Sequence, residues 1–188
     1  MIVIRRYDPE KHHRRSIRLK GYDYSREGCY FITLRSKERG NFFGQICNGI
    51  MHLNDYGILA NDEWVRTPGL RPGIETGAYI IMPDHIHGIL IILSHDVRAR
   101  CCAPQTSAPQ TSAPQTIAPQ SSIPPAGIIG SIVRGYKATV TKQINIMRNT
   151  PRQPVWQRNY YERIIRNDKA FRQISEYIRN NPLKWKGK

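Results

Sequence analysis

Residues 77–93 read Gly-Ala-Tyr-Ile-Ile-Met-Pro-Asp-His-Ile-His-Gly-Ile-Leu-Ile-Ile-Leu. Two apolar segments, 77–82 and 86–93, flank a Pro-Asp pair, and their isoleucines are typical of strands, whereas Pro and Asp favour turns. The pattern predicts two strand segments, arranged either as a hairpin or as one long strand with a bulge.

A His-x-His pair begins the second of these segments. Residues i and i+2 of a strand face the same side, so His85 and His87 would present two imidazoles together while Ile86 enters the core. Two neighbouring imidazoles suit a divalent metal, although an ordinary pair of hydrogen-bonded histidines has the same pattern. No Cys or third His lies at a helpful spacing, which disfavours structural zinc. The small Gly88 would leave room for another chain or a ligand.

The charge of the chain is concentrated at its two ends. The 188 residues hold 29 Lys and Arg against 14 Asp and Glu, a net charge of +15. Residues 1–40 carry a net +6 and residues 131–188 a net +11, whereas residues 41–97 carry −4 and residues 98–130 carry +2. This distribution predicts a nucleic-acid groove formed by both ends around a near-neutral middle.

The length and the low-complexity segments predict one domain, 1–188, with two appendages. Residues 1–25 form a basic N-terminal arm, for which a solvated tail is the alternative. Residues 98–126 contain four Ala-Pro-Gln pentads from position 103 onward, and proline every fifth residue opposes helix and strand alike, so we expect a disordered loop without catalytic residues. Neither a membrane span nor a signal peptide is predicted, which favours a cytoplasmic protein without membrane contact.

Periodicity predicts the remaining elements. We expect a strand at 29–35, a hairpin or irregular strands at 42–53 around Asn48-Gly49, a strand at 155–166, and helices at 54–67, 127–147 and 168–180, the last capped by Asp168. This order predicts an α+β fold, a ferredoxin-like antiparallel sheet with helices packed on it, and fits a bundle or barrel less well.

The last predicted helix carries a polar pair beside an apolar stripe. Phe171, Ile174 and Ile178 form the expected buried stripe, and Tyr177 and Asn181 lie four residues apart on one flank of it. A Tyr and an Asn on one flank would make a coherent site beside a metal. Core packing of the Tyr is the alternative.

Four segments, taken in order, resemble the single-tyrosine HUH transposases, and specifically the REP-associated tyrosine transposases, in which U is a hydrophobic residue. They are the apolar lead into residues 82–87, residues 132–137, residues 156–162 and residues 177–182. The resemblance covers most of the chain, and the pentad repeat departs from the family pattern.

The resemblance implies a ferredoxin-like domain, monomeric or homodimeric, that nicks and rejoins single-stranded or hairpin DNA through a 5′-phosphotyrosine. His85 and His87 would be ligands of Mg²⁺ or Mn²⁺, Asn181 the third ligand and Tyr177 the nucleophile. Tyr160 and Tyr161, on the strand expected at 155–166, are rival nucleophiles.

Basic and aromatic residues outside the site would bind the DNA, because aromatics alternate with Arg in residues 156–166 and no duplex-reading motif is present. Trp156 and Tyr160 would either pack or stack on unpaired bases. The predicted DNA-binding residues are Arg5, Arg6, Arg14, Arg15, Arg18, Lys20, Arg134, Lys137, Trp156, Arg158, Tyr160, Arg163, Arg172 and Arg179. A non-catalytic hairpin DNA- or RNA-binding regulator and a metal phosphodiesterase that acts through water are the alternative functions.

Overall fold

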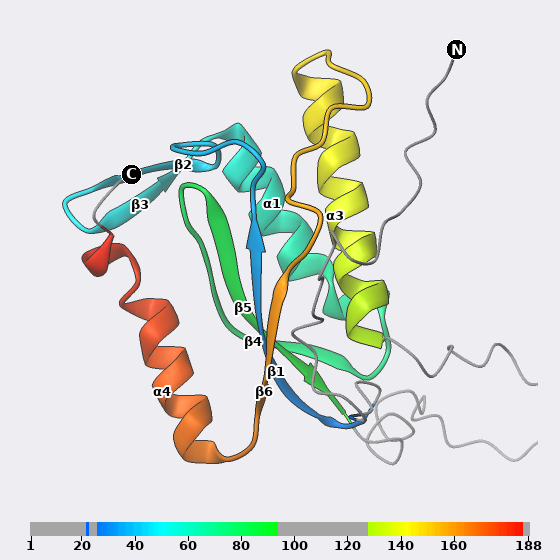
Figure 1. Cartoon of the computed structure of the whole chain (residues 1–188), viewed down its shortest axis with the longest axis vertical. Coiled ribbons are helices and arrows are strands. Elements are labelled where there is room, and N and C mark those ends of the chain that lie inside the picture. The colour runs from blue at the N-terminus through cyan, green and yellow to red at the C-terminus, as the bar shows by residue number, and fades with distance from the viewer. Residues whose placement is uncertain (1–21, 23–25, 94–127, 186–188) are drawn as a thin grey trace, which may run out of the picture.

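The computed structural model describes residues 22, 26–93 and 128–185 and has an α+β architecture. A four-stranded antiparallel sheet has the order β4-β5-β1-β6 and is covered by helices on both faces (Figure 1). Its strands are β1 (Gly28–Arg35), β4 (Ile74–Ile81), β5 (His85–Ile92) and β6 (Tyr161–Ile165). The helices are α1 (Asp55–Arg66), α3 (Ile128–Met147) and α4 (Asp168–Arg179), and short 3-10 turns follow at η1 (Pro68–Leu70) and η2 (Pro182–Lys184). The predicted fold class is confirmed.

The apolar stretch 77–93 forms a hairpin at the centre of the sheet. β4 and β5 pair on either side of the turn at residues 82–84, and the register shifts between Thr76 and Tyr79. β5 is buried over almost its whole length because it lies between β4 and β1 and helices cover both faces. The turn is held by Ser36, whose backbone N–H donates to the Asp84 carbonyl at 2.9 Å and whose single hydroxyl proton is within reach of the Asp84 and Glu38 carbonyls.

The larger core lies between the sheet and the helices α1 and α3. The predicted four-residue step along α3 is buried there, at Ile132, Tyr136, Val140 and Ile144. Trp64 of α1 meets the Tyr136 ring edge to face, with the ring centroids 5.5 Å apart. These large side chains supply most of the apolar burial that stabilises the sheet.

The opposite face of the sheet is covered by α4 through a smaller cluster. Ile178 is buried in it, and Phe171 and Ile174 pack against it half-buried, so the predicted stripe faces the sheet. The predicted cap is wrong by one residue. Asn167 is the N-cap, because its extended backbone lets its side chain accept from the Ala170 N–H at 2.8 Å, and Asp168 is the first helical residue.

The strand expected at 155–166 is shorter than predicted. Only Tyr161–Ile165 pairs continuously with β1, and Trp156 makes an isolated bridge with Ser36. Val155 and Trp156 are buried in the larger core, which turns this segment away from a regular ladder. Trp156 therefore both packs in the core and makes a single bridge to β1.

The hairpin at 42–53 and the helix after it are confirmed. β2 (Gly44–Cys47) and β3 (Ile50–Leu53) form a separate two-stranded sheet. Asn48 and Gly49 at the turn have φ of 52° and 76°, the positive values that a two-residue hairpin turn favours. Asn54 caps α1 by accepting from the Gly57 N–H at 3.0 Å.

Two predicted appendages lie outside the described residues. The arm at 1–25 is described only at Tyr22, and the loop at 98–126 is not described. In the part of the chain that the structure covers, no helix combines the length and apolar character needed to cross a membrane. The single domain and the cytoplasmic location stay predictions.

Gly88 does not provide the open space expected from the sequence. It follows His87 on β5 and therefore faces the opposite side, toward α1. A Cβ atom there would lie 2.2 Å from Cζ2 of Trp64. The absence of a side chain at this position accommodates an indole of the core.

We therefore expect Gly88→Ala to destabilise the fold by about 1–3 kcal/mol, because the buried Trp64 ring has to move to admit the methyl group. Urea unfolding monitored by circular dichroism measures the change. Gly69→Ala is the control, since no heavy atom lies within 4 Å of a Cβ there. Equal stabilities of the two variants would contradict this account of the core.

Candidate active site

The pairing of β1 with β5 places the two histidines on the α4 face of the sheet. Thr33 is the partner of His87, and Arg35 is the partner of His85. Directly paired residues of antiparallel strands point to the same face, so Thr33 and Arg35 lie beside the imidazoles. Ile86, between the histidines, is 1% exposed in the larger core, as its alternation predicts.

The two imidazoles approach each other through their Nε2 atoms. Their Nε2 atoms lie 3.0 Å apart, and each residue is 6% exposed. His85 Nδ1 is 2.5 Å from Asp84 Oδ1, and His87 Nδ1 is 2.9 Å from Thr33 Oγ1. A carboxylate only accepts hydrogen bonds, so His85 donates through Nδ1–H and presents a lone pair at Nε2.

Burial keeps both histidines neutral. It lowers the pKa of His87 to about 3, with smaller contributions from the charge that His85 would carry if protonated and from the charge of Arg35. Burial also lowers the pKa of His85, against the opposing effect of the Asp84 carboxylate. Neutral imidazoles are the form that binds metal ions, so the pair is in its ligand state at pH 7.

The two Nε2 atoms are spaced as two adjacent ligands of a small divalent ion would be. Nitrogens bound at right angles at about 2.0–2.1 Å lie about 2.9 Å apart, close to the observed 3.0 Å separation. The described residues contain no group of three His, Cys, Asp or Glu that could hold a metal. A third protein ligand from this part of the chain would therefore be of another type.

Tyr177 reaches the histidine pair from the last turn of α4. Its Oη lies 3.4 Å from His87 Nε2, and the two ring centroids are 5.4 Å apart. Phe31 stacks on His87 at 5.3 Å and meets the Tyr177 ring at 6.2 Å. Tyr177 as a whole is nevertheless 45% exposed.

Asn181 lies two residues beyond the end of α4 and is 9% exposed. Among the described residues, its side-chain amide makes no hydrogen bond to either imidazole. Its backbone forms the start of η2, where the Asn181 carbonyl accepts from the Lys184 N–H at 3.1 Å. The structure brings together His85, His87 and Tyr177, and the role of Asn181 stays a prediction.

The two rival tyrosines lie on opposite faces of the chain. Tyr161 pairs with Thr33 and is 46% exposed on the histidine face, with its ring 6.3 Å from Phe31. Tyr160 packs against the larger core, with Lys137 Nζ 5.9 Å from the centre of its ring. The predicted alternation of these two residues is therefore present.

Three residues near the site were not predicted from the sequence. Asp84 and Thr33 each hold one imidazole through its Nδ1. The Trp185 ring lies 5.7 Å from the His85 ring. Asp84 could have been found from its place beside His85, whereas Thr33 depends on the strand register and Trp185 on the path of the chain after α4.

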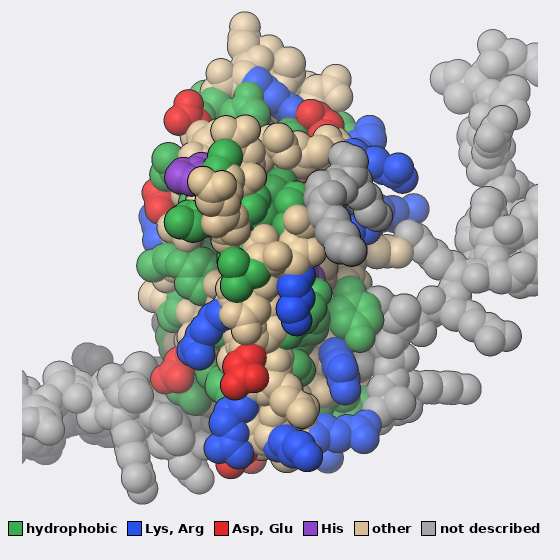
Figure 2. All heavy atoms as spheres, turned by 90° about the vertical axis from the view of Figure 1, so that its left-hand side faces the viewer, with side chains coloured by type: hydrophobic (Ala, Val, Ile, Leu, Met, Phe, Trp, Pro, Cys, Tyr) green, Lys and Arg blue, Asp and Glu red, His purple; other side chains and the backbone are tan. Residues whose placement is uncertain are grey.

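The predicted DNA-binding residues are distributed over several surfaces. Arg163 is exposed on the histidine face, and Arg172 and Arg179 are exposed on α4. Figure 2 looks onto the side that carries α4 and shows Lys and Arg side chains gathered over it. Arg158 is exposed in the segment before β6 and Arg134 on α3. The six predicted residues of the N-terminal arm lie outside the described part of the chain.

Two of the predicted DNA-binding residues make structural contacts. Trp156 is 7% exposed and packs between Phe43 and Tyr136, as expected for the packing alternative, and a contact with DNA stays a prediction. Lys137 is half-buried on α3, and its Nζ donates to the carbonyls of Gln157 and Asn159 at 2.8 and 3.0 Å. It fastens the segment before β6 to α3.

Comparison with known proteins gives a sequence relative and structural neighbours. The chain is 43% identical over 180 residues to an uncharacterized protein of Haemophilus influenzae, covering 96% of this chain and 94% of that protein. It resembles a solved REP-associated tyrosine transposase bound to a REP hairpin, with a TM-score of 0.57 and 19% identity, over 89% of this chain and 73% of the other. No protein-family model matches. At 19% identity the structural likeness concerns the fold.

We expect Lys137→Met to lower the free energy of unfolding by about 1–2 kcal/mol, because two hydrogen bonds to backbone carbonyls are lost. Arg134→Met is the control, since Arg134 is exposed on the same helix.

Burial lowers the pKa of Lys137 from about 10.5 to about 8. The unfolded chain therefore binds more protons between these values, and wild type should gain stability relative to Lys137→Met as the pH rises through this window. Equal free energies of unfolding of Lys137→Met and Arg134→Met at pH 7 would contradict the structural role of Lys137.

Proposed function

We propose that this chain, which belongs to one family with the uncharacterized Haemophilus influenzae protein and has the fold of a REP-associated tyrosine transposase, is a metal-dependent nuclease and strand transferase. Its substrate is single-stranded or hairpin DNA. One observation carries the proposal: the hydroxyl of the partly exposed Tyr177 lies 3.4 Å from Nε2 of His87, which belongs to a buried pair of imidazoles with Nε2 atoms 3.0 Å apart.

The metal would be held by Nε2 of His85 and of His87, with the amide oxygen of Asn181 as the third protein ligand. Mg²⁺ or Mn²⁺ bound there would polarise the scissile phosphate and stabilise the charge that develops on it. Asp84 and Thr33 would hold the imidazoles in the orientation that directs both Nε2 atoms to one point.

Tyr177 would be the nucleophile. Its hydroxyl would give its proton to solvent during attack. A bond forms between Tyr177 Oη and phosphorus, the bond from phosphorus to the 3′ oxygen breaks, and that oxygen takes a proton from water. The products are a 5′-phosphotyrosine and a free 3′ hydroxyl. Attack by a 3′ hydroxyl reverses the step, so rejoining needs no ATP.

Positive charge around the site supports an anionic polymer as substrate. Arg35 and Arg163 lie on the same face of the sheet as the histidines, and Arg172 and Arg179 are exposed on the helix that carries Tyr177. Such side chains position a phosphate backbone without reading its sequence. The structural neighbour was solved with a REP hairpin, which supports hairpin DNA as the class of ligand.

A non-catalytic hairpin-binding regulator is the second candidate. It is favoured by one observation: in the described part of the chain no third His, Cys, Asp or Glu completes a metal site. A regulator would bind hairpin DNA without cutting it. A metal phosphodiesterase that acts through water would cut without forming a protein–DNA adduct.

Tyr177→Phe should abolish a covalent protein–DNA adduct and leave hairpin binding within about twofold, because only the attacking oxygen is removed. A 3′-labelled DNA hairpin with unpaired flanks is incubated with the protein and Mn²⁺, and the adduct is read on a denaturing gel. Tyr161→Phe is the matched control, since Tyr161 is 46% exposed on the same face against 45% for Tyr177. Wild-type binding without an adduct, or an undiminished adduct with Tyr177→Phe, would contradict the mechanism.

Asp84→Asn should weaken Mn²⁺ binding by about 10- to 100-fold, because the carboxylate that holds His85 Nδ1–H is replaced by a neutral amide. Isothermal titration of the DNA-free protein with Mn²⁺ measures this effect independently of nicking. Asp62→Asn, on the exposed side of α1, is the control. Mn²⁺ affinity equal to wild type in Asp84→Asn would contradict the orienting role.

A further inference from the structure

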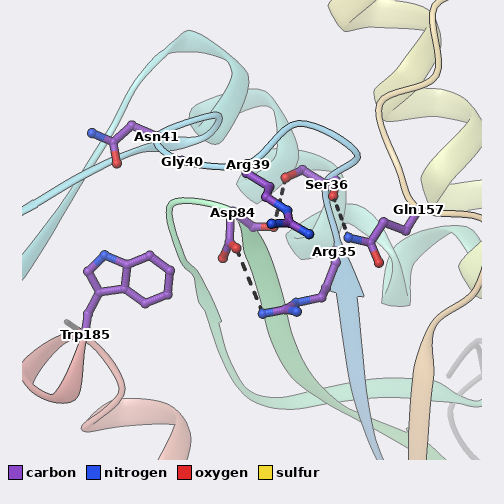
Figure 3. Close-up of a pocket in the computed structure, with 8 residues that line it drawn as sticks. All are labelled: Arg35, Ser36, Arg39, Gly40, Asn41, Asp84, Gln157 and Trp185. Atoms are coloured by element: carbon purple, nitrogen blue, oxygen red, sulfur yellow. Dashed lines mark hydrogen bonds and ion pairs between the residues drawn. The ribbon is translucent and has the colours of Figure 1, made fainter. Parts of the chain in front are cut away.

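A polar pocket adjoins the histidine pair at the end of the β4–β5 hairpin. It lies between the loop that follows β1, the Asp84 turn and the end of η2, with a cavity volume of about 140 Å³ (Figure 3). The side chains that matter here are Arg35, Arg39, Asn41, Asp84, Gln157 and Trp185. None of the functions argued above uses the pocket itself. Resting on the proposed function, we infer that it binds one unpaired nucleotide next to the cleaved phosphate.

The size of the pocket suits one aromatic ring system. An enclosed cavity of about 150 Å³ holds one benzene, and this pocket is open to solvent on one side, so a larger base can project from it. Figure 3 shows the Trp185 indole forming one wall, across the pocket from Arg35 and Gln157. An indole face is a platform on which any nucleobase can stack.

The charge of the pocket suits a phosphate. Arg35 and Arg39 contribute two guanidinium groups against the single carboxylate of Asp84. Both oxygens of that carboxylate are engaged, one with His85 Nδ1 at 2.5 Å and one with Arg35 at 4.0 Å. Among the described residues Arg39 makes no ion pair, so its planar fork of donors is available to a phosphate or a base edge.

Amide groups supply the means to orient a base. Gln157 Nε2 donates to the Ser36 carbonyl at 3.1 Å, which fixes that side chain at the wall of the pocket. Its remaining amide oxygen is an acceptor that can receive a base N–H, and exposed Asn41 adds both a donor and an acceptor. An aromatic platform, two cations and two amides together match a nucleotide better than they match an acidic peptide, which has no ring to stack.

The pocket is coupled to the chemistry through shared residues. Asp84 lines the pocket and also holds His85, and the Trp185 ring lies 5.7 Å from the His85 ring. A base stacked on Trp185 would therefore place its own backbone beside the imidazoles. The pocket would select which phosphate reaches Tyr177, because the nucleotide must be unpaired to enter.

The test uses the full chain without metal. The four deoxynucleoside 5′-monophosphates are titrated at up to millimolar concentration, with inorganic phosphate and the unphosphorylated nucleosides as separate arms. Trp64 and Trp156 are 2% and 7% exposed, so quenching of tryptophan emission reports mainly on half-buried Trp185. Saturable quenching by nucleotides is expected. No saturation, or phosphate binding as tightly as the nucleotides, would overturn the inference.

Variants separate stacking from folding. By calorimetry, Trp185→Ala should weaken nucleotide binding about tenfold, and Trp185→Phe should restore most of it because a stacking face returns. Lys184→Ala, at the adjacent exposed position, is the control and should bind as wild type does. Equal affinity of Trp185→Ala and wild type would overturn the inference.

The final arm connects the pocket to DNA. With Tyr177→Phe protein, which cannot form the adduct, single abasic sites are moved along the unpaired flanks of a DNA hairpin. An abasic site at one position should weaken hairpin binding about tenfold. The same abasic site should not weaken binding further in protein that also carries Trp185→Ala. A penalty at that position unchanged by Trp185→Ala would overturn the inference. This experiment needs neither metal nor nucleophile, so it can succeed when nicking fails. If wild type forms the adduct but no abasic position shows a penalty that depends on Trp185, the inference about the pocket is overturned and the proposed function is not.

Discussion

The antiparallel register of β1 with β5 is the constraint on which the site depends. It places Thr33 opposite His87 and Arg35 opposite His85, and it sends Ile86 to the other face. A slip of one residue would reverse every side chain and bury two imidazoles in the apolar core. The register is held at its end by Ser36, whose backbone N–H donates to the Asp84 carbonyl. The partners of the imidazoles thus follow from backbone hydrogen bonds.

Strong local patterns predicted most of the fold. The isoleucine-rich segments around His85, the four-residue step along α3 and the Asn48-Gly49 turn all correspond to observed elements, because each depends on neighbours close in sequence. The strand around Trp156 was predicted too long, because a core contact with Phe43, far away in sequence, overrides strand propensity there. The cap at Asn167 was missed by one residue because Asn and Asp are both good caps.

The candidate site was predictable only in part. His85 and His87 follow from the alternation of a strand, and Tyr177 follows from its flank of α4 together with the family resemblance. Thr33 carries no signal of its own, because its role exists only through pairing with β5. Trp185 lies after η2, where neither periodicity nor a motif indicates the direction of the chain. Such contacts come from tertiary packing and require the folded chain.

The two faces of the sheet differ in the size of the apolar cluster that covers them. Tyr177 lies on the face with the smaller cluster. The helices α1 and α3 close over a large core, whereas α4 rests on a small cluster around Ile178, with Phe171 and Ile174 only half-buried. Elements with few buried apolar contacts open at a lower free energy than the whole domain. Tyr177 is thus carried by an element with fewer buried apolar contacts than the strands that carry the histidines, and a local opening of α4 would separate its hydroxyl from the imidazoles.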